Sequence, residues 1–236
     1  MPIMTTTPIR TTEMTAFPAE LFLWLSPAFP VGGFAFSHGL EKLVEDGIVA
    51  DRASLSAWLT DLATSGSLHN DLLLLTEAWR AVQTDDTARL LAAAELAAAL
   101  QPGAERQLET LTQGRGFGAA CTAAWEVPSM ALLAKSNRLA YPVAVGAAAA
   151  DRQIALEATL DAYTLGFCSN LMSAAIRLSV IGQFDGQRVL ADLVPVLQAA
   201  ALNAVSGTLD DLGGACFATD LASLAHETQH VRLFRS

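Results

Sequence analysis

The sequence has few charged residues and especially few basic ones. Asp, Glu, Lys and Arg make up 16% of its 236 residues, where about a quarter is typical. The 14 basic residues are outnumbered by 24 acidic ones, and the net charge of −10 argues against a nucleic-acid-binding protein, which should carry a basic stripe. Because apolar residues make up 52%, we expect a large core and a surface with apolar areas that often mark interfaces.

Cysteine is also scarce. Cys121, Cys168 and Cys216 are odd in number, far apart and without a CxxC pair, which excludes a disulfide framework. We interpret them as buried thiols in a reducing compartment. No apolar stretch follows a basic cluster at the N-terminus, so the sequence predicts no signal peptide and a cytoplasmic location. The threonines and prolines of residues 1–18 predict a flexible lead-in.

Motifs for nucleotide hydrolysis and nucleophilic catalysis are missing. The sequence contains no GxxxxGK[ST] and no GxSxG, and the glycines of GRGFGAA (residues 114–120) do not match GxGxxG. The residues before them predict a helix, so we interpret these glycines as a helix break or a close contact between helices. The sequence predicts a protein that is not an enzyme and has no cofactor.

One uncharged stretch raises the alternative of a membrane segment. Residues 21–40 carry no formal charge and are nominally long enough to span a bilayer. Pro27, Pro30, Gly32 and Gly33 interrupt this stretch, and a bilayer would leave the broken backbone without hydrogen-bond partners. We therefore expect a buried or interfacial segment and no insertion into a membrane.

Strand patterns are nearly absent, whereas helical signals recur along the chain. Asp51 is a candidate N-cap of a helix with apolar residues at i, i+3, i+4 and i+7 from Leu55 and an end near Gly66. Other helices are expected to begin near Asn70 or Asp71, near Asp85 or Asp86, at Ala104 (to Thr112), at Pro128 and at Asp185. Pro195 is expected to kink or divide the last of these. Residues Asp151–Ile181 are predicted to be helical almost throughout, with any break near Gly166. The sequence predicts an all-α, single compact domain of roughly eight to ten helices, with its body at residues 19–225.

Three segments do not fit a simple helical core. Residues 25–41 read LSPAFPVGGFAFSHGLE and combine helix breakers with phenylalanines, so something must cover them. Residues 182–187 read GQFDGQ and predict a tight turn with glycine at positive φ and a helix cap at its aspartate. Residues 226–236 read HETQHVRLFRS, a basic and apolar tip on an acidic protein. This tip predicts docking on the chain's own body or on another protein.

The tail also matches the HExxH pattern of zinc proteases formally. A helix would place His226 and His230 on one face, with Glu227 at the position of the motif's glutamate. A protease of this kind also needs a third ligand and a surrounding cleft. We consider the match coincidental. A helical metal-dependent hydrolase and transient binding of a divalent metal by His226 and His230 remain the alternatives.

Together the three segments resemble the UreF family of urease accessory proteins. The first is similar to the family pattern L-x-L-S-x-x-F-P-x-G-x-F-x-x-S-x-G-L-E. The second reads AIRLSVIGQFDGQ and is similar to A-x-R-L-x-x-x-G-Q-x-D-G-Q, and the tail is similar to H-E-T-Q-Y-S-R-L-F-x-S. The blocks occur in the family's order from about Leu21 to Ser236. His230 and Val231 depart from the pattern, so the tyrosine hydroxyl of the tail is lost.

The resemblance implies an all-helical, non-enzymatic and dimeric scaffold that bridges UreD (also called UreH) and the GTPase UreG and delivers nickel to apo-urease. The alternative is a nickel-binding metallochaperone that passes nickel itself, through His38, the tail histidines His226 and His230, or an internal water channel. The resemblance also implies partner binding by residues of the three segments. These are Phe29, Pro30, Gly33, Ser37, His38, Gly39, Glu41, Gly182, Gln183, Asp185, Gly186, Gln187, His226, Glu227, Arg232, Leu233, Phe234 and Arg235.

Residues 226–236 are expected to be the partner-docking tail. Arg232 and Arg235 would supply charge-assisted hydrogen bonds, and Leu233 and Phe234 would supply buried apolar contact. Deletion of the tail is then expected to abolish partner binding while the helical content stays nearly intact.

Overall fold

The structure, a computed structural model, describes residues 18–236, and the flexible lead-in predicted for residues 1–18 lies outside them apart from Pro18. The described residues form eleven α-helices, two 3-10 helices and no strand, which confirms the all-α prediction. The elements are α1 (Ala19–Trp24), η1 (Gly33–Ala35), α2 (Leu40–Glu45), α3 (Arg52–Ser65), α4 (Ser67–Gln83), α5 (Thr87–Ala99), α6 (Ala104–Ala124), α7 (Pro128–Ser136), α8 (Tyr141–Asp151), α9 (Leu156–Arg177), α10 (Gln183–Ser206), η2 (Leu209–Asp211) and α11 (Phe217–His226).

The centre of the fold is α8. Its residues from Pro142 to Ala150 are all buried, and it packs against α4, α6, α7 and α9. Small side chains let these helices approach closely: a Cβ on Gly146 would lie 2.3 Å from the Leu75 carbonyl oxygen of α4. Alanine and glycine in α8 therefore set the distance between the central helices.

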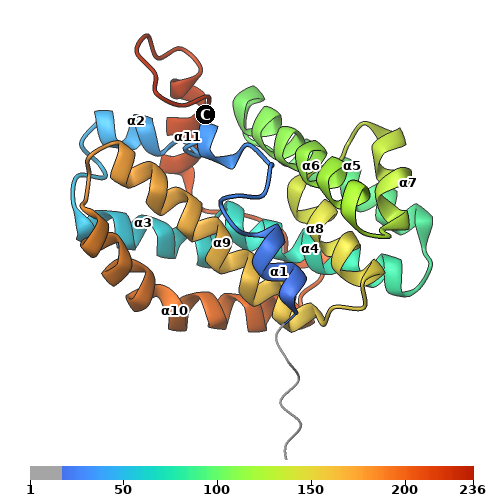
Figure 1. Cartoon of the computed structure of the whole chain (residues 1–236). Helices are drawn as coiled ribbons and strands as arrows, with labels where there is room; N and C mark the ends of the chain where they lie inside the picture. Colours follow the sequence, from blue (N-terminus) through green and yellow to red (C-terminus); the bar gives the residue numbers. More distant parts are fainter. Residues whose placement is uncertain (1–17) are drawn as a thin grey trace, which may run out of the picture.

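The other helices surround this centre (Figure 1). In the view drawn, α5, α6 and α7 lie on one side and α9 and α10 on the other, while α3 packs against α4 and α10. At one end α2 packs against α11, and the C-terminal residues form the loop at the top of the molecule. The first described residues lie toward the opposite end.

Several helix boundaries confirm the sequence-based predictions. The Asp51 carboxylate accepts a hydrogen bond from the backbone N–H of Ser54 (2.9 Å), and the Ser54 hydroxyl closes a capping box at the start of α3. The carboxylate of Asp86 caps α5 by accepting a hydrogen bond from the backbone N–H of Arg89 (2.9 Å). Pro128 occupies the first turn of α7, where its missing N–H costs no helical hydrogen bond.

Other helices are longer or start elsewhere than predicted. α4 begins at Ser67, and α6 continues beyond Thr112 to Ala124. α6 therefore includes GRGFGAA, whose glycines make close contacts between helices and no break. The expected helix over residues 151–181 is α9, which runs only from 156 to 177 and continues unbroken through Gly166. α10 is not divided at Pro195.

The uncharged stretch at residues 21–40 is not one helix, because it is divided among α1, η1 and the start of α2. Of the described helices, α10 is the one that is long and apolar enough to cross a membrane by length and composition. It packs against α9, α3 and α4 through Val189, Leu193 and Leu197. A single helix of this kind is weak evidence for a membrane span.

Candidate functional site

Residues 25–41 fold back over the helical body, which covers most of their apolar side chains. The ring of Phe29 packs 5.5 Å from the ring of Phe117, and Phe36 is buried. Phe34 points outward and is 72% exposed. The segment is thus a lid with one aromatic side chain left in solvent.

Beneath this lid lies a cavity of about 670 Å³. Its walls combine apolar residues of the lid with polar and titratable side chains from α4, α6, α8 and α9. The latter are Asp71, Arg106, Glu109, Thr110, Gln113, Tyr141, Tyr163, Ser169 and Asn170. A concave site with a few convergent polar groups is the best candidate functional site of a fold. From the sequence-predicted residues, the cavity brings together Phe29, Pro30, Gly33, His38 and Gln183.

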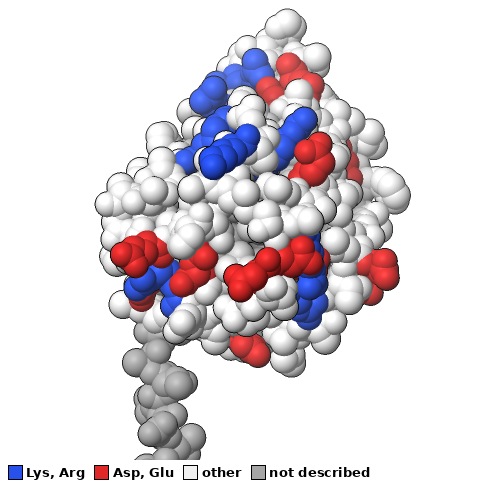
Figure 2. Space-filling view, turned by 90° about the vertical axis from the view of Figure 1, so that its right-hand side faces the viewer, with Lys and Arg blue, Asp and Glu red and all other residues white. Residues whose placement is uncertain are grey.

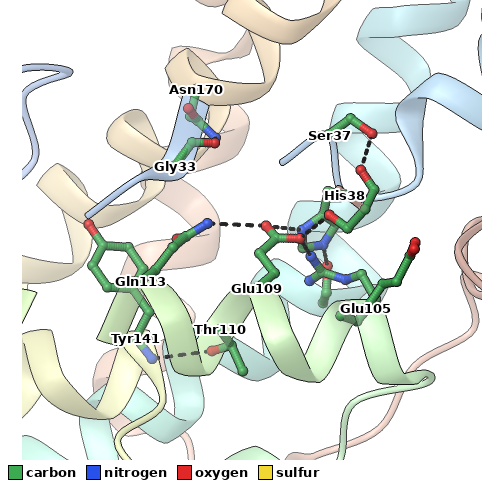
Figure 3. A network of polar contacts seen from close by, with 12 residues as sticks. Gly33, Ser37, His38, Glu105, Glu109, Thr110, Gln113, Tyr141 and Asn170 are labelled. Atoms are coloured by element: carbon green, nitrogen blue, oxygen red, sulfur yellow. Dashed lines mark hydrogen bonds and ion pairs between the residues drawn. The ribbon is translucent and has the colours of Figure 1, made fainter. Parts of the chain in front are cut away.

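The polar wall is organised around Glu109 of α6, as Figure 3 shows. Its carboxylate pairs with Arg106, lies 3.4 Å from Nδ1 of His38, and accepts a hydrogen bond from Gln113 (3.3 Å). The other ring nitrogen of His38 lies 2.5 Å from the Ser67 hydroxyl. A charged pair and an imidazole are therefore buried side by side at the cavity.

Burial controls the charge state of this wall. Desolvation, together with the nearby Arg106, lowers the pKa of His38 to about 4. Burial alone would raise the pKa of Glu109. The Arg106 guanidinium and hydrogen bonds from His38 and Ser236 outweigh that effect and hold the pKa at about 2. At neutral pH the wall contains a neutral imidazole and an ionised Glu109–Arg106 pair.

Asp71 is the second carboxyl group of the cavity. Burial raises its pKa to about 7, although the Tyr163 hydroxyl donates a hydrogen bond to it (2.9 Å). Burial also raises the pKa values of Tyr163 and of the neighbouring Tyr141 well above their usual range, so both phenols stay protonated. Asp71 is thus the cavity group whose charge changes near neutral pH.

The tail docks on the body of its own chain, next to the cavity. The backbone N–H of Ser37 donates to the Ser236 carbonyl oxygen (2.8 Å), and the Ser37 hydroxyl contacts the same oxygen. The Ser236 hydroxyl donates to Glu109 (2.7 Å), and the Arg235 N–H donates to the Ala35 carbonyl (2.9 Å). The tail and the lid are therefore joined, and the tail completes the Glu109 network.

Glu41 of α2 holds the tail backbone. Its two carboxylate oxygens accept the N–H groups of Leu233 (2.7 Å) and Phe234 (2.9 Å). The buried His226 ring lies between two carboxylates, with Nε2 3.2 Å from Glu41 and Nδ1 2.6 Å from Glu105. Gly39 at φ +81 precedes α2, and a Cβ there would lie 2.6 Å from the Ser223 hydroxyl of α11. Only glycine permits this junction.

Two further tail residues bind the start of α6. Arg232 donates to Glu105 (2.6 Å), as the predicted charge-assisted bond requires, but the acceptor belongs to the same chain. A Glu227 oxygen accepts the backbone N–H of Glu105 (3.2 Å) and so caps α6. The HET residues thus form structural contacts.

The two apolar residues of the tail point in opposite directions. Phe234 is buried under the Arg177 guanidinium, which lies 4.4 Å from the ring centre. Leu233 is 62% exposed and Val231 is 85% exposed. Figure 2 shows a largely uncharged face on which basic side chains gather toward the upper end, the height at which the tail lies in Figure 1. The tail therefore presents an apolar edge at an end of the molecule where basic and acidic side chains lie together.

GQFDGQ differs from its prediction. Gly182 precedes α10 with φ −87, and Gly186 is buried inside that helix against Met172. Asp185 lies in the first turn and pairs with Arg188 (2.8 Å), so it is not the cap. The left-handed residue of this connection is Ser179 at φ 62, and Gln183 reaches the cavity. Gly186 thus serves packing, Gly182 is the N-cap of α10, and neither glycine forms the predicted turn.

The geometry of HETQH does not match that of HExxH. α11 ends at His226, and the exposed His230 lies in the following loop, so the two imidazoles do not share a helical face. His226 is buried between Glu41 and Glu105. Among residues 18–236, no group of three or more His, Cys, Asp or Glu side chains is placed to hold a metal ion.

Sequence reasoning missed the α6 face that forms the site. Arg106, Glu109, Thr110 and Gln113 are buried and follow one another at i, i+3, i+4 and i+7. A polar stripe at helical spacing, in a helix with few apolar residues, is the signal that could have revealed it. Asp71 gave no comparable signal, because it resembles a helix-starting residue.

Comparisons with known proteins agree with this picture. The sequence profile of the UreF family matches residues 49–194. A urease accessory protein UreF of Bradyrhizobium sp. strain BTAi1 is 50% identical over 92% of this chain and 91% of its own length. One from Methylobacterium radiotolerans is 50% identical over 92% and 96%, and one from Rhodopseudomonas palustris strain HaA2 is 48% identical over the full length of both. The chain therefore belongs to the UreF family of urease accessory proteins and has a role in urease maturation.

Proposed function

We propose that this protein is a non-enzymatic, cytoplasmic scaffold that bridges UreD (UreH) and the GTPase UreG during nickel insertion into apo-urease. We further propose that it works as a homodimer. Family membership supports partners in urease maturation. The sequence supports a division of labour, since it lacks a P-loop and GTP hydrolysis would belong to the partner.

The observation that carries this proposal is the outward edge of the tail. Glu41 fixes the backbone at residues 233 and 234, while the side chains of Val231 and Leu233 stay in solvent. Among the described residues, no carboxylate lies within ion-pair distance of Arg235. Arg235 instead lies over the ring of Phe36, 5.9 Å from its centre. A pre-ordered apolar edge of this kind loses little conformational entropy when a partner binds.

Replacing both exposed tail residues tests the proposal. The double variant Val231→Ser/Leu233→Ser is expected to bind purified UreD/UreH or UreG at least about tenfold more weakly, because it removes apolar contact and keeps the backbone grip of Glu41. Isothermal titration calorimetry measures the affinities. Ile48→Ser, which changes a side chain that is 55% exposed in the turn after α2, is the matched control. Unchanged affinity of the double variant for both partners would contradict the proposal.

A second candidate function is a route for nickel through the cavity. His38, Asp71 and Glu109 offer nitrogen and oxygen donors along one wall, which supports transient contact with a divalent cation. We propose a conduit and not a storage site. Calorimetry with Ni²⁺ on the isolated protein should then show no tight stoichiometric binding. Tight binding of one ion per chain would contradict the conduit.

A further inference from the structure

The cavity under the lid brings aromatic rings and a carboxyl group together. Both tyrosines of the chain, Tyr141 and Tyr163, line it, together with Phe29 and Phe167. The two tyrosine rings lie 5.6 Å apart, centre to centre. Asp71 of α4 lines the same cavity and contacts the Tyr163 hydroxyl. The walls therefore offer the aromatic surface and the negative charge that positively charged organic molecules bind.

The carboxylate of Asp71 has one oxygen atom without a donor. Its Oδ2 atom accepts the hydrogen bond from the Tyr163 hydroxyl (2.9 Å). Within residues 18–236, no hydrogen-bond donor reaches its Oδ1 atom. A carboxylate away from bulk water gains a strong, charge-assisted hydrogen bond when a ligand supplies an N–H group. Asp71 thus favours a ligand that donates hydrogen bonds.

The charges next to Asp71 favour a cation. Arg106 is paired with Glu109, so the two charges balance each other. His38 stays neutral because burial lowers its pKa to about 4. The inner wall of the cavity therefore has the charge of Asp71 when that group is ionised.

The mouth of the cavity does not change this balance. Phe34 and Gln183 line the cavity and are exposed, so the cavity opens to solvent beside them. Arg177 also lines the mouth, but its guanidinium binds the Phe34 carbonyl oxygen (2.5 Å) and lies over the ring of Phe234. The charged side chains that act on Asp71 are Arg106 and Glu109, and not Arg177.

An organic cation fits this wall better than a resident metal ion. In the described part of the chain, no three His, Cys, Asp or Glu side chains are placed to hold a metal. A metal ion gives up its water only to several oxygen or nitrogen ligands, whereas an ammonium or guanidinium group also binds aromatic faces. A cavity of about 670 Å³ is typical of sites for small organic molecules.

We propose that the cavity under the lid binds a small organic cation, with its ammonium or guanidinium group at Asp71 and its apolar body against the rings of Phe29, Tyr141, Tyr163 and Phe167. The site is independent of the scaffold function, which uses the outward edge of the tail. Because the ligand contacts the lid, α4, α8 and α9 together, its binding stabilises the folded chain.

Calorimetry at pH 8, where Asp71 is ionised, tests the site with benzylammonium chloride. Benzyl alcohol, which has the same ring and no charge, is the ligand control. The wild type should bind benzylammonium with a Kd of about 1 mM or tighter, and benzyl alcohol at least about tenfold more weakly. Benzylammonium should also raise the melting temperature of the wild type.

Two carboxyl variants locate the bound cation. Asp71→Asn keeps the size of the side chain and removes its charge, so it should weaken benzylammonium binding at least about tenfold. Asp192→Asn is the matched control, because Asp192 lies with Asp51 and Asp61 in a separate hollow formed by α3 and α10. This variant should bind benzylammonium with wild-type affinity.

Ser169→Leu gives a second test that does not depend on Asp71. Ser169 of α9 lines the cavity, so leucine should occupy part of its volume and weaken benzylammonium binding. Circular dichroism verifies that the variants are folded. Three results would each overturn the proposal: no benzylammonium binding by the wild type, equal binding of benzyl alcohol, or wild-type affinity in the folded cavity variants. Loss of binding in Asp192→Asn alone would place the cation in the surface hollow and overturn it too.

Discussion

At the scale of single residues, Glu41 connects the body to the tail. It accepts two backbone N–H groups and lies within hydrogen-bond distance of His226. Glu41→Gln keeps the shape of the side chain but points an amide N–H at the backbone N–H donors of the tail. We therefore expect a loss of about 2 kcal/mol in the free energy of unfolding. Urea denaturation measures it. Glu45→Gln on the exposed side of α2 is the control, and equal losses in the two variants would refute a special role for Glu41.

His38 predicts a pH dependence of stability. Its pKa is 6.5 in the unfolded chain and about 4 in the buried state, so between these values the unfolded chain binds a proton that the folded chain excludes. Stability should therefore fall as pH drops from 6.5 toward 4, by about 3 kcal/mol. His38→Asn should lack this part of the slope. Parallel pH profiles of the two proteins would contradict a buried, neutral His38.

Which of these residues the sequence could reveal depended on their surroundings. Glu41, Arg232 and His226 stood in motifs and were named. The charges of α6 were not, because a buried ion pair and a solvated surface charge look the same in sequence. Only the polar stripe from Arg106 to Gln113 would have distinguished them.

At the scale of elements, glycines in α6 fix how closely the chain packs. A Cβ on Gly114 would lie 1.9 Å from the Leu139 carbonyl oxygen, which is backbone and cannot easily move. Gly114→Ala should therefore lower the free energy of unfolding by about 1–3 kcal/mol, although alanine favours helix. Thermal unfolding checks this. Gly182→Ala, where a Cβ meets no atom within 4 Å, should change little; a Gly114→Ala protein as stable as that control would contradict the close contact.

The docked tail changes the expectation for its deletion. Removing residues 227–236 exposes the pocket of the buried Phe234 and leaves Glu41 and Glu109 without tail donors. We expect a loss of about 3–5 kcal/mol, comparable to truncation of a buried phenylalanine. Denaturation monitored by circular dichroism measures it. An undiminished unfolding free energy would show that the tail is not held to the body in solution.

Helix boundaries were predictable where local chemistry decides them. Asp51, Asp86 and Pro128 mark helix starts through capping and proline geometry, and all three were predicted. The length of α6 and the end of α11 were not, because tertiary contacts decide them. Glycine disfavours helix by about 1 kcal/mol, yet α6 keeps its glycines for the contact at Leu139. The helical periodicity of α11 would likewise predict that its apolar side faces the core, whereas the structure exposes that side to solvent.

At the scale of the whole molecule, the all-α fold followed from the absence of strand patterns and the abundance of alanine. The position of the tail did not follow, because a basic, apolar segment can dock on its own body or elsewhere. In the structure the tail docks on the body through the buried Phe234 and Ser236, and the same segment exposes Val231 and Leu233 to solvent. Phe217, Leu221 and Leu224 of α11 are also exposed, so the chain has two adjacent apolar surfaces at one end, and Glu41 contacts both segments.

The most direct test of the scaffold is whether the chain holds two partners at once. Sedimentation velocity of the purified protein mixed with UreD/UreH and UreG should show one species that contains all three proteins, and Val231→Ser/Leu233→Ser should reduce its amount at least about tenfold. A UreG that displaces UreD/UreH, so that only two-protein complexes form, would contradict the bridging function.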